Sequence, residues 1–266
     1  MAKIIALVNQ KGGVGKTTTA VNLAAYFAQA GRRVLLVDID PQGNASAGVG
    51  VNSQAEVPNV YHVLLEPDRI KEVIQKTSYE NLSILPAQAD LAGAAVELVG
   101  ADSREYKLKQ ALSKVGEDYD YVLIDCPPSL GLLTVNGLAA ADQVLIPIQA
   151  EYYALEGLGQ LMNTVNLIQE HLNNSLDILG ALVTMYDSRN RLANAVVQEL
   201  KSHFPNKLFM TMIPRNVRLA EAPSYGQPVM VYDAASRGAE AYKLLAEEVL
   251  KILEPLETKE PYGQTI

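Results

Sequence analysis

Two lysines and a threonine stand among glycines near the start of the chain, in the run Lys11-Gly12-Gly13-Val14-Gly15-Lys16-Thr17. Residues 4–8 before this run are short, continuous and rich in isoleucine and valine, as in a buried strand, and residues 18–29 after it have apolar side chains at helical spacing. A glycine-rich turn between a strand and a helix N-terminus lets backbone N–H groups and the helix dipole surround an anion. Lys16 can then neutralise β- and γ-phosphates, and the Thr17 hydroxyl can ligate Mg²⁺.

The run departs from the usual phosphate-loop pattern, G-x-x-x-x-G-K-[ST], because Gln10 stands where the first glycine is expected. A second lysine, Lys11, precedes Lys16 instead. The alternative interpretation is a glycine turn with two solvated lysines. The strand before the turn and the helix after it favour phosphate binding.

Carboxylates follow two further apolar runs. Asp38 and Asp40 come after residues 32–37, and Asp125 follows residues 121–124. Open α/β sheets bind ligands at the carboxyl ends of their strands, and an aspartate at such an end can hold a water of a Mg²⁺ ion beside a phosphate loop. Asp38 and Asp40 alternate across their strand, so they cannot point the same way. The alternative is that they cap the turn that follows.

Short apolar strands alternate with amphipathic helices, which predicts an α/β fold with a doubly wound, mainly parallel sheet flanked by helices. No composition break or Gly/Ser-rich linker divides the chain, so we expect a single domain over residues 1–254 and an acidic disordered tail over residues 255–266. Strands are predicted at residues 4–8, 32–37, 82–86, 121–125, 144–147, 178–185 and 208–213. Helices are predicted at residues 18–29, 91–99, 103–115, 151–171, 192–204 and 236–253, with shorter helical pieces at 60–65 and 68–76 and a mobile loop over 44–60.

The composition limits the classes of function. A formal charge of −8 over 266 residues argues against nucleic-acid binding by the whole surface, so any DNA contact has to come from a local basic patch. The single cysteine, Cys126, excludes a disulfide framework and a multi-cysteine metal site within one chain. There is no signal peptide, and no apolar run is as long as a membrane span. We therefore expect a soluble, cytoplasmic protein.

One segment reverses the overall charge. Residues 187–218 carry six lysines and arginines against two acidic residues, a local charge of +4. Such a segment is either a spread-out solvated surface or a patch that binds nucleic acid, and the sequence leaves both interpretations open.

Five stretches together carry a family resemblance: residues 11–17, 37–44, 124–131, 151–157 and 213–219. They resemble the chromosome-partitioning ATPases of the ParA/Soj family, members of the ParA/MinD superfamily with a deviant Walker A loop. The resemblance covers nearly the whole chain. No helix-turn-helix segment precedes the loop, and in this respect the chain resembles the short chromosomal class of the family.

The resemblance implies a P-loop ATPase site for ATP or ADP with Mg²⁺. Lys11, Lys16 and Asp40 would be catalytic: Lys11 would reach the nucleotide of a partner subunit, and Asp40 would help to position the attacking water. Thr17 and, through a water, Asp125 would hold Mg²⁺. The resemblance implies that the phosphates are surrounded by Lys11, Gly12, Gly13, Val14, Gly15, Lys16, Thr17 and Thr18. The residues implied at the adenine are Met185, Pro214 and Asn216. The residues implied to contact DNA are Arg189 and Arg218.

The resemblance also implies a cycle. ATP would bring two subunits face to face as a homodimer, and this dimer would bind double-stranded DNA without sequence preference. A ParB-like centromere-binding protein would stimulate an otherwise slow hydrolysis and release the DNA. The protein would then be nucleoid-associated in the cytoplasm and act in chromosome or plasmid segregation, and a replication initiator is compatible as a further partner.

Three rival interpretations have distinguishable requirements. A MinD-like membrane-associated positioning ATPase needs a basic amphipathic C-terminal helix, whereas residues 247–257 are acidic and contain a proline. An iron–sulfur reductase that shares the loop needs two cysteines per subunit, and this chain has one. A metabolic ligase similar to dethiobiotin synthetase is disfavoured by the basic segment.

Tyr152 and Tyr153 are candidates for a dimer face.

Overall fold

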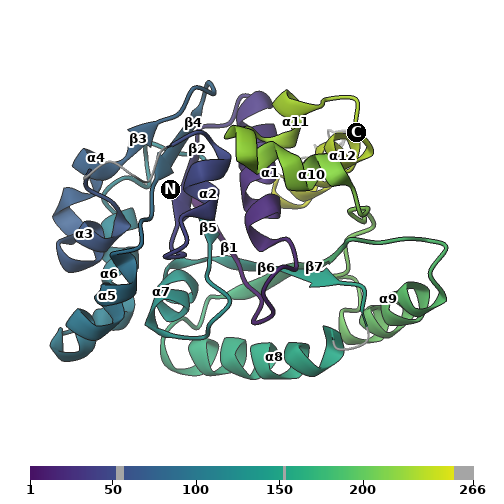
Figure 1. The fold of residues 1–266 in the computed structure, drawn as a ribbon. Helices are drawn as coiled ribbons and strands as arrows, with labels where there is room; N and C mark the ends of the chain where they lie inside the picture. The colour runs from purple at the N-terminus through teal and green to yellow at the C-terminus, as the bar shows by residue number, and fades with distance from the viewer. Residues whose placement is uncertain (52–56, 152–153, 255–266) are drawn as a thin grey trace, which may run out of the picture.

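The computed structural model describes residues 1–51, 57–151 and 154–254. Its centre is a seven-stranded sheet in the order β3-β4-β2-β5-β1-β6-β7, parallel except for the short edge strand β3 (Figure 1). Helices cover both faces, so the predicted doubly wound α/β fold is confirmed. The strands are β1 (Lys3–Leu7), β2 (Val34–Asp38), β3 (Gln75–Lys76), β4 (Leu82–Leu85), β5 (Tyr121–Asp125), β6 (Gln143–Gln149) and β7 (Asp177–Thr184).

The helices fall into two layers. Helices α3 to α9 pack on one face of the sheet, and α1, α2, α11 and α12 pack on the other, with α10 beside them. The first set is α3 (Val60–Leu65), α4 (Ile70–Val73), α5 (Leu91–Glu97), α6 (Lys107–Leu112), α7 (Leu132–Ala140), α8 (Ala154–His171) and α9 (Arg191–His203). The second set is α1 (Lys16–Gln29), α2 (Asn44–Gly48), α10 (Val217–Glu221), α11 (Val229–Tyr232) and α12 (Arg237–Leu253). Short 3₁₀ turns are η1 (Pro67–Arg69), η2 (Leu98–Gly100), η3 (Arg104–Tyr106) and η4 (Ala222–Tyr225).

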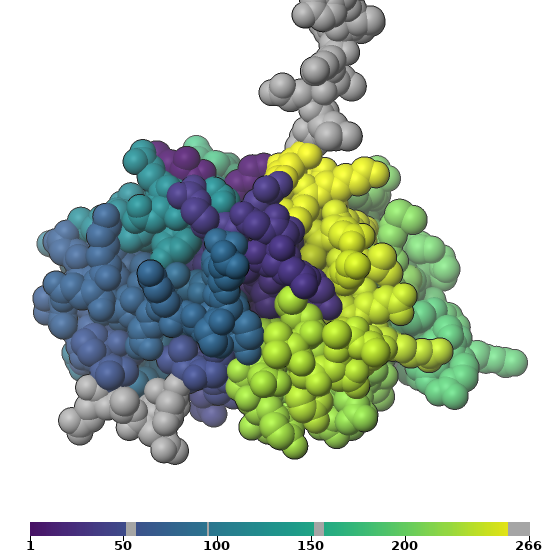
Figure 2. Space-filling model, turned by 90° about the horizontal axis from the view of Figure 1, so that it is seen from above, coloured from purple at the N-terminus to yellow at the C-terminus, as the bar shows by residue number. Residues whose placement is uncertain are grey.

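The central strands are buried on both faces, which explains their continuous apolar runs. In β1, Ile5 and Leu7 pack against the layer of α1 and α12, while Ala6 packs against the opposite layer. Helix α12 lies along α1, and the space-filling view shows the yellow α12 beside the purple α1 on this face (Figure 2). In the described part of the chain, no helix combines the length and the hydropathy needed to cross a membrane.

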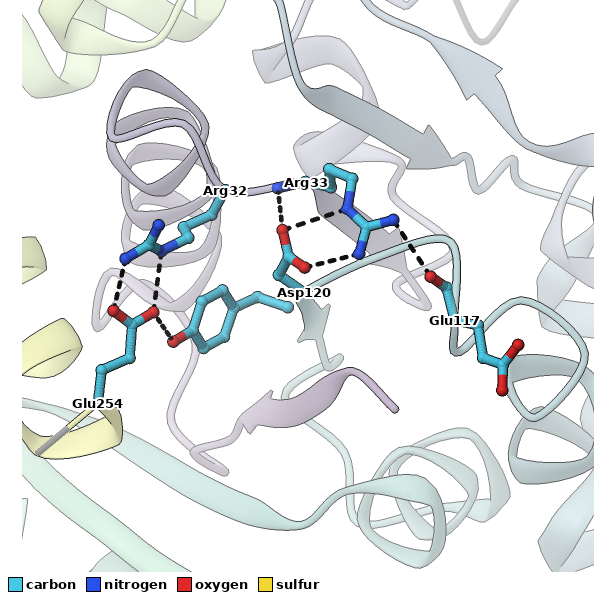
Figure 3. A network of polar contacts seen from close by, with 6 residues as sticks. Arg32, Arg33, Glu117, Asp120 and Glu254 are labelled. Carbon is cyan, nitrogen blue, oxygen red and sulfur yellow. Dashed lines mark hydrogen bonds and ion pairs between the residues drawn. The ribbon is translucent and has the colours of Figure 1, made fainter. Parts of the chain in front are cut away.

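Ion pairs close the amino-terminal edge of the sheet (Figure 3). The Arg32 guanidinium lies 2.6 Å from the Glu254 carboxylate, which also accepts a hydrogen bond from the Tyr121 hydroxyl. Beside them, Arg33 pairs with Asp120 at 2.7 Å. These contacts join the ends of α1 and α12 to the start of β5, and the bonds from Arg32 and Tyr121 lower the pKa of Glu254. The charges at this edge are therefore matched within the chain.

The prediction of a strand at residues 208–213 is wrong. Only isolated parallel bridges form there, between Leu208 and Ala181 and between Pro214 and Tyr186. The N–H groups of Met210 and Thr211 instead donate to the carboxylate of Glu248 on α12, at 2.7 and 3.0 Å. In the middle of the segment, the carboxylate of Glu248 thus takes the place of the backbone acceptors that a neighbouring strand would offer.

The loop predicted over residues 44–60 is also partly wrong, because residues 44–48 form α2 and residues 60 onward form α3, as separately predicted. The helical piece predicted at 68–76 ends at Val73, and Gln75–Lys76 pairs antiparallel with β4. The helix predicted over 103–115 is shorter, since a 3₁₀ turn precedes α6. Helix α8 begins at Ala154; Tyr152, Tyr153 and the tail at 255–266 lie outside the described residues.

Candidate functional site

The glycine-rich loop runs from the end of β1 to the first turn of α1. Gly13 and Gly15 have φ angles of +74° and +90°, a left-handed conformation in which other residues are strained. Gly15 is the N-cap of α1 and makes no side-chain capping bond, so the first N–H groups of this 14-residue helix lack a cap. A Cβ atom on Gly12 or Gly13 would meet nothing within 4 Å. The loop therefore presents backbone donors to open space, as an anion site requires.

Lys16 lies inside the loop with 6% of its surface exposed. Its Nζ donates to the Lys11 carbonyl oxygen at 3.3 Å. Burial lowers the pKa of Lys16, and the charges of Asp125 and Asp40 oppose this shift. A buried ammonium has three N–H donors, so a phosphate placed in the loop would satisfy donors that a single carbonyl does not.

Lys11, the second lysine, lies on the rim of the same loop. Its Nζ makes a 2.9 Å ion pair with Glu151 of its own chain, and both side chains are more than a third exposed. Its backbone N–H donates to the Asn9 side chain. An exposed pair of this kind contributes only about 0–1 kcal/mol, so Lys11 can exchange Glu151 for another anion at small cost.

Thr17 and Asp125 meet beside the loop. The Thr17 hydroxyl donates to Asp125 Oδ2 at 2.7 Å. Asp125 is fully buried, and its Oδ1 has no hydrogen-bond partner among the residues that the structure describes. Burial, followed by the charge of Asp38, raises the pKa of Asp125 well above its usual value. Unpaired buried carboxylate oxygens are rare, and a metal-bound water would satisfy this one.

The residues present therefore fit a Mg²⁺ ion. Among the described residues, no group of three or more His, Cys, Asp or Glu side chains could hold a metal by itself. Mg²⁺ usually keeps several waters and takes few ligands from the protein, with phosphate oxygens completing its shell. Thr17 would ligate the ion directly, and Asp125 would hold one of its waters.

Asp38 and Asp40 occupy different surroundings at the end of β2. Asp38 is fully buried and is paired in register with Asp125 on the neighbouring strand. Burial, with the charge of Asp40 adding to it, raises the pKa of Asp38 to about 6. Asp40 is 8% exposed, and one of its carboxylate oxygens accepts the Gln42 N–H at 3.0 Å.

A separate cavity of about 340 Å³ lies beside the first turn of α1 and the end of β7. The structure brings Met185, Pro214, Asn216 and Thr18 together in its wall, although they are far apart in the sequence. The rest of the wall is largely apolar and is made by Thr184, Ile213, Arg215, Val217, Leu219, Ala220 and Tyr242. A pocket with largely apolar walls suits a flat heterocycle. Adenine contact by these residues stays a prediction.

Sequence reasoning missed three residues with hydroxyl groups behind the loop. The Thr184 hydroxyl donates to the Val14 carbonyl at 2.7 Å, and the hydroxyls of Thr19 and Tyr242 lie 3.0 Å apart. A polar residue at the carboxyl end of an apolar strand is a usable signal for Thr184. Tyr242 gives no such signal, because only the tertiary fold brings α12 against α1.

The two arginines predicted to contact DNA are exposed but already paired. Arg189 makes a two-pronged contact with Asp187, at 3.0 and 2.8 Å. Arg218 pairs with Glu221 at 2.8 Å and with Asp233 at 3.1 Å. Glu221 and Asp233 lie outside the segment 187–218, so the local charge of +4 overstates the positive potential at Arg218.

The fold and the loop define a P-loop nucleotide-binding protein. Residues 2–178 match a family model described as an AAA domain. The chain is 57% identical over 249 residues to the sporulation initiation inhibitor protein Soj of Bacillus subtilis (strain 168), covering 94% of this chain and 98% of that relative. It is 52% identical to the chromosome partitioning protein ParA of Myxococcus xanthus (strain DK1622) over 251 residues, 94% of this chain and 89% of that one.

Among solved structures, cobyrinic acid a,c-diamide synthase from Mycobacterium smegmatis with bound ADP and magnesium superposes with a TM-score of 0.84 at 38% identity, covering 96% of each chain. The identity to Soj and ParA is higher and extends over nearly the whole sequence. This chain belongs to the ParA/Soj family of chromosome-partitioning ATPases.

The raised pKa of Asp125 predicts a pH dependence. As the pH falls, Mg²⁺ must compete with a proton for this carboxyl, so Mg²⁺-dependent nucleotide affinity should be weaker in acid and should rise as the pH is raised. Titration calorimetry over a series of pH values measures this rise. The Asp125→Asn variant is the control, because its amide does not titrate and the rise should shrink. An equal rise in both proteins would remove Asp125 from the metal site.

Proposed function

We propose that this chain is a nucleotide-switched ATPase that forms a homodimer with ATP, binds DNA without sequence preference as that dimer, and drives chromosome or plasmid segregation. The nucleotides are ATP and ADP with Mg²⁺, in keeping with the ADP and magnesium bound to the similar synthase from Mycobacterium smegmatis. The names of the Bacillus and Myxococcus relatives support the role in partitioning.

The observation that carries the proposal is the different placement of the two lysines. Lys16 is buried inside the loop, where it serves the phosphates of its own subunit. Lys11 is exposed on the rim, and among the described residues its ammonium is held by Glu151 alone, so it can move to a phosphate presented by a second subunit. A cation supplied in trans links nucleotide binding to dimerisation, and it makes a lone subunit a slow enzyme.

Hydrolysis at this site needs positioning and charge neutralisation more than a covalent catalyst. Mg²⁺ would neutralise the charge that develops on the β- and γ-phosphates. Lys16 holds the γ-phosphate in the loop, and Lys11 adds charge from the other subunit. Asp40 lies close enough for its charge to act on Lys16, and it would orient the attacking water.

DNA binding would rest on phosphate contacts by Arg189 and Arg218. Each arginine has to exchange its carboxylate partners for DNA phosphates, so one patch binds weakly. Two patches in one dimer act together and raise the affinity without any new contact. The binding should be sensitive to salt and indifferent to sequence, because phosphates carry no sequence information. A ParB-like partner would stimulate hydrolysis and reverse the binding, and a replication initiator is a further candidate partner.

The first test uses the Asp40→Ala variant, which should bind ATP but hydrolyse it slowly and so accumulate as a dimer. Its binding to non-specific duplex DNA is measured with and without ATP at two salt concentrations, with anionic liposomes in parallel. ATP-dependent, salt-sensitive DNA binding without liposome binding supports the proposal. Liposome binding without DNA binding would favour a MinD-like positioning ATPase instead, and a wild-type hydrolysis rate would remove Asp40 from the mechanism.

Substitution of each lysine should have a different effect. Lys16→Ala should lose ATP binding, whereas Lys11→Ala should bind ATP and fail to dimerise, because its charge acts on the other subunit. Fluorescent-nucleotide titration measures the first effect, and light scattering with a non-hydrolysable ATP analogue measures the second. Tight nucleotide binding by Lys16→Ala, or a normal dimer from Lys11→Ala, would contradict these roles.

Charge reversal tests the arginines. Arg189→Glu and Arg218→Glu should each weaken DNA binding by about tenfold or more at low salt, while ATP-dependent dimers still form. Lys114→Glu, which makes the same charge change beside Asp68, just after α6 and outside the basic segment 187–218, is the matched control and should bind DNA like the wild type. Unchanged affinity in both arginine variants would refute the patch.

A further inference from the structure

The carboxylate of Asp38 is the anchor of the segment that carries Asp40. Its Oδ1 accepts the backbone N–H of Asp40 at 3.1 Å. Its Oδ2 accepts both the backbone N–H and the hydroxyl of Ser46, each at 2.8 Å. Asp38 and Ser46 are both fully buried. One side chain at the end of β2 therefore holds both the turn at residues 39–43 and the helix α2 that follows it.

Ser46 extends the anchor to a second strand. Its hydroxyl donates to Asp38 and accepts the Ala87 N–H at 3.1 Å, just after the end of β4. Helix α2 is thereby attached to two neighbouring strands of the sheet. Asp38 would have to move together with both attachments for the turn to shift.

The far end of α2 is also held. A Cβ atom on Gly48 would lie 3.1 Å from Val21 of α1, so the helix packs closely there. Beyond it, the backbones of Gly50 and Gly226 touch, since a Cβ atom on Gly226 would lie 2.9 Å from the Gly50 Cα. With α2 fixed at both ends, the place of Asp40 relative to the phosphate loop depends on the bonds made by Asp38.

We propose that Asp38 is a positioning residue for hydrolysis: by accepting the N–H groups of Asp40 and Ser46, it fixes Asp40 where the attacking water has to be oriented. This inference rests on the role proposed above for Asp40. A carboxylate suits the task because both of its oxygens accept hydrogen bonds, whereas an amide has one acceptor oxygen and an NH₂ donor. Burying a charge near Asp125 and Asp40 costs stability, and the three bonds to the segment that carries Asp40 offset that cost.

The test compares steady-state hydrolysis by Asp38→Asn and Ser46→Ala with the wild type. In Asp38→Asn an NH₂ group faces N–H donors, and in Ser46→Ala the link to Ala87 is lost. We expect kcat to fall by about 10- to 100-fold in Asp38→Asn and less in Ser46→Ala, with KM for ATP within about threefold, because a small misplacement of a catalytic group acts on the reacting step. Each kcat is expressed per nucleotide-binding site counted by stoichiometric titration.

Asn173→Ala is the matched control. Asn173 is buried and donates to the carbonyl oxygens of Leu138 and Ala141, away from the phosphate loop, so its loss should lower Tm and leave kcat per site unchanged. A wild-type kcat per site in both Asp38→Asn and Ser46→Ala would overturn the inference, as would an equal loss in the control. If Asp38→Asn does not fold, Ser46→Ala decides alone. Wild-type hydrolysis by Asp40→Ala would instead overturn the role of Asp40, so the two failures are distinguishable.

Discussion

Buried charge at the carboxyl edge of the sheet is the constraint on which the rest of the structure depends. Lys16, Asp38 and Asp125 are almost completely buried where three parallel strands end. In such surroundings electrostatic interactions are strong and unpaired groups are costly. The apolar strands behind the charges, packed on both faces, supply the stability that keeps them in place. The site is thus assembled at a point where the protein alone leaves charge and hydrogen-bonding capacity unmatched.

This contrast is clear when the edge of the sheet formed by the amino ends of the strands is compared with the edge formed by their carboxyl ends. At the amino-terminal edge, Arg32 and Arg33 meet Glu254 and Asp120 in short ion pairs that remain partly exposed to solvent. At the carboxyl edge, Asp125 keeps an oxygen without a partner among the described residues, and the Lys16 ammonium donates to a backbone carbonyl oxygen. One edge fastens helices to strands, and the other is completed by ligands. This division follows from parallel strands, which place all of their carboxyl ends on one side.

Much of the site could be predicted from the sequence, because its residues lie in short runs whose spacing has local meaning. The phosphate loop, the aspartates at the ends of β2 and β5 and the positions of most strands along the chain follow from glycine placement and apolar periodicity. Helix α2 could not be predicted in this way, because its small polar residues resemble a loop until Asp38 and Ser46 are seen to bond. The same holds for residues 208–213, where the carboxylate of Glu248 on a distant helix takes the N–H groups that a strand would use. The pairing of Arg218 with Asp233 is likewise a product of the fold, and a count of charges along the sequence misses it.

A crystal structure with Mg²⁺ and a non-hydrolysable ATP analogue would test the central claim most directly. With the phosphates in the loop, the Thr17 hydroxyl should leave Asp125 and ligate Mg²⁺, and Asp125 Oδ1 should accept a hydrogen bond from a metal-bound water. Lys16 should move from the Lys11 carbonyl to the γ-phosphate. A nucleotide bound elsewhere, or a Thr17–Asp125 hydrogen bond that persists with Asp125 Oδ1 still unpartnered, would contradict the claim that this edge of the sheet is completed by Mg²⁺ and phosphate.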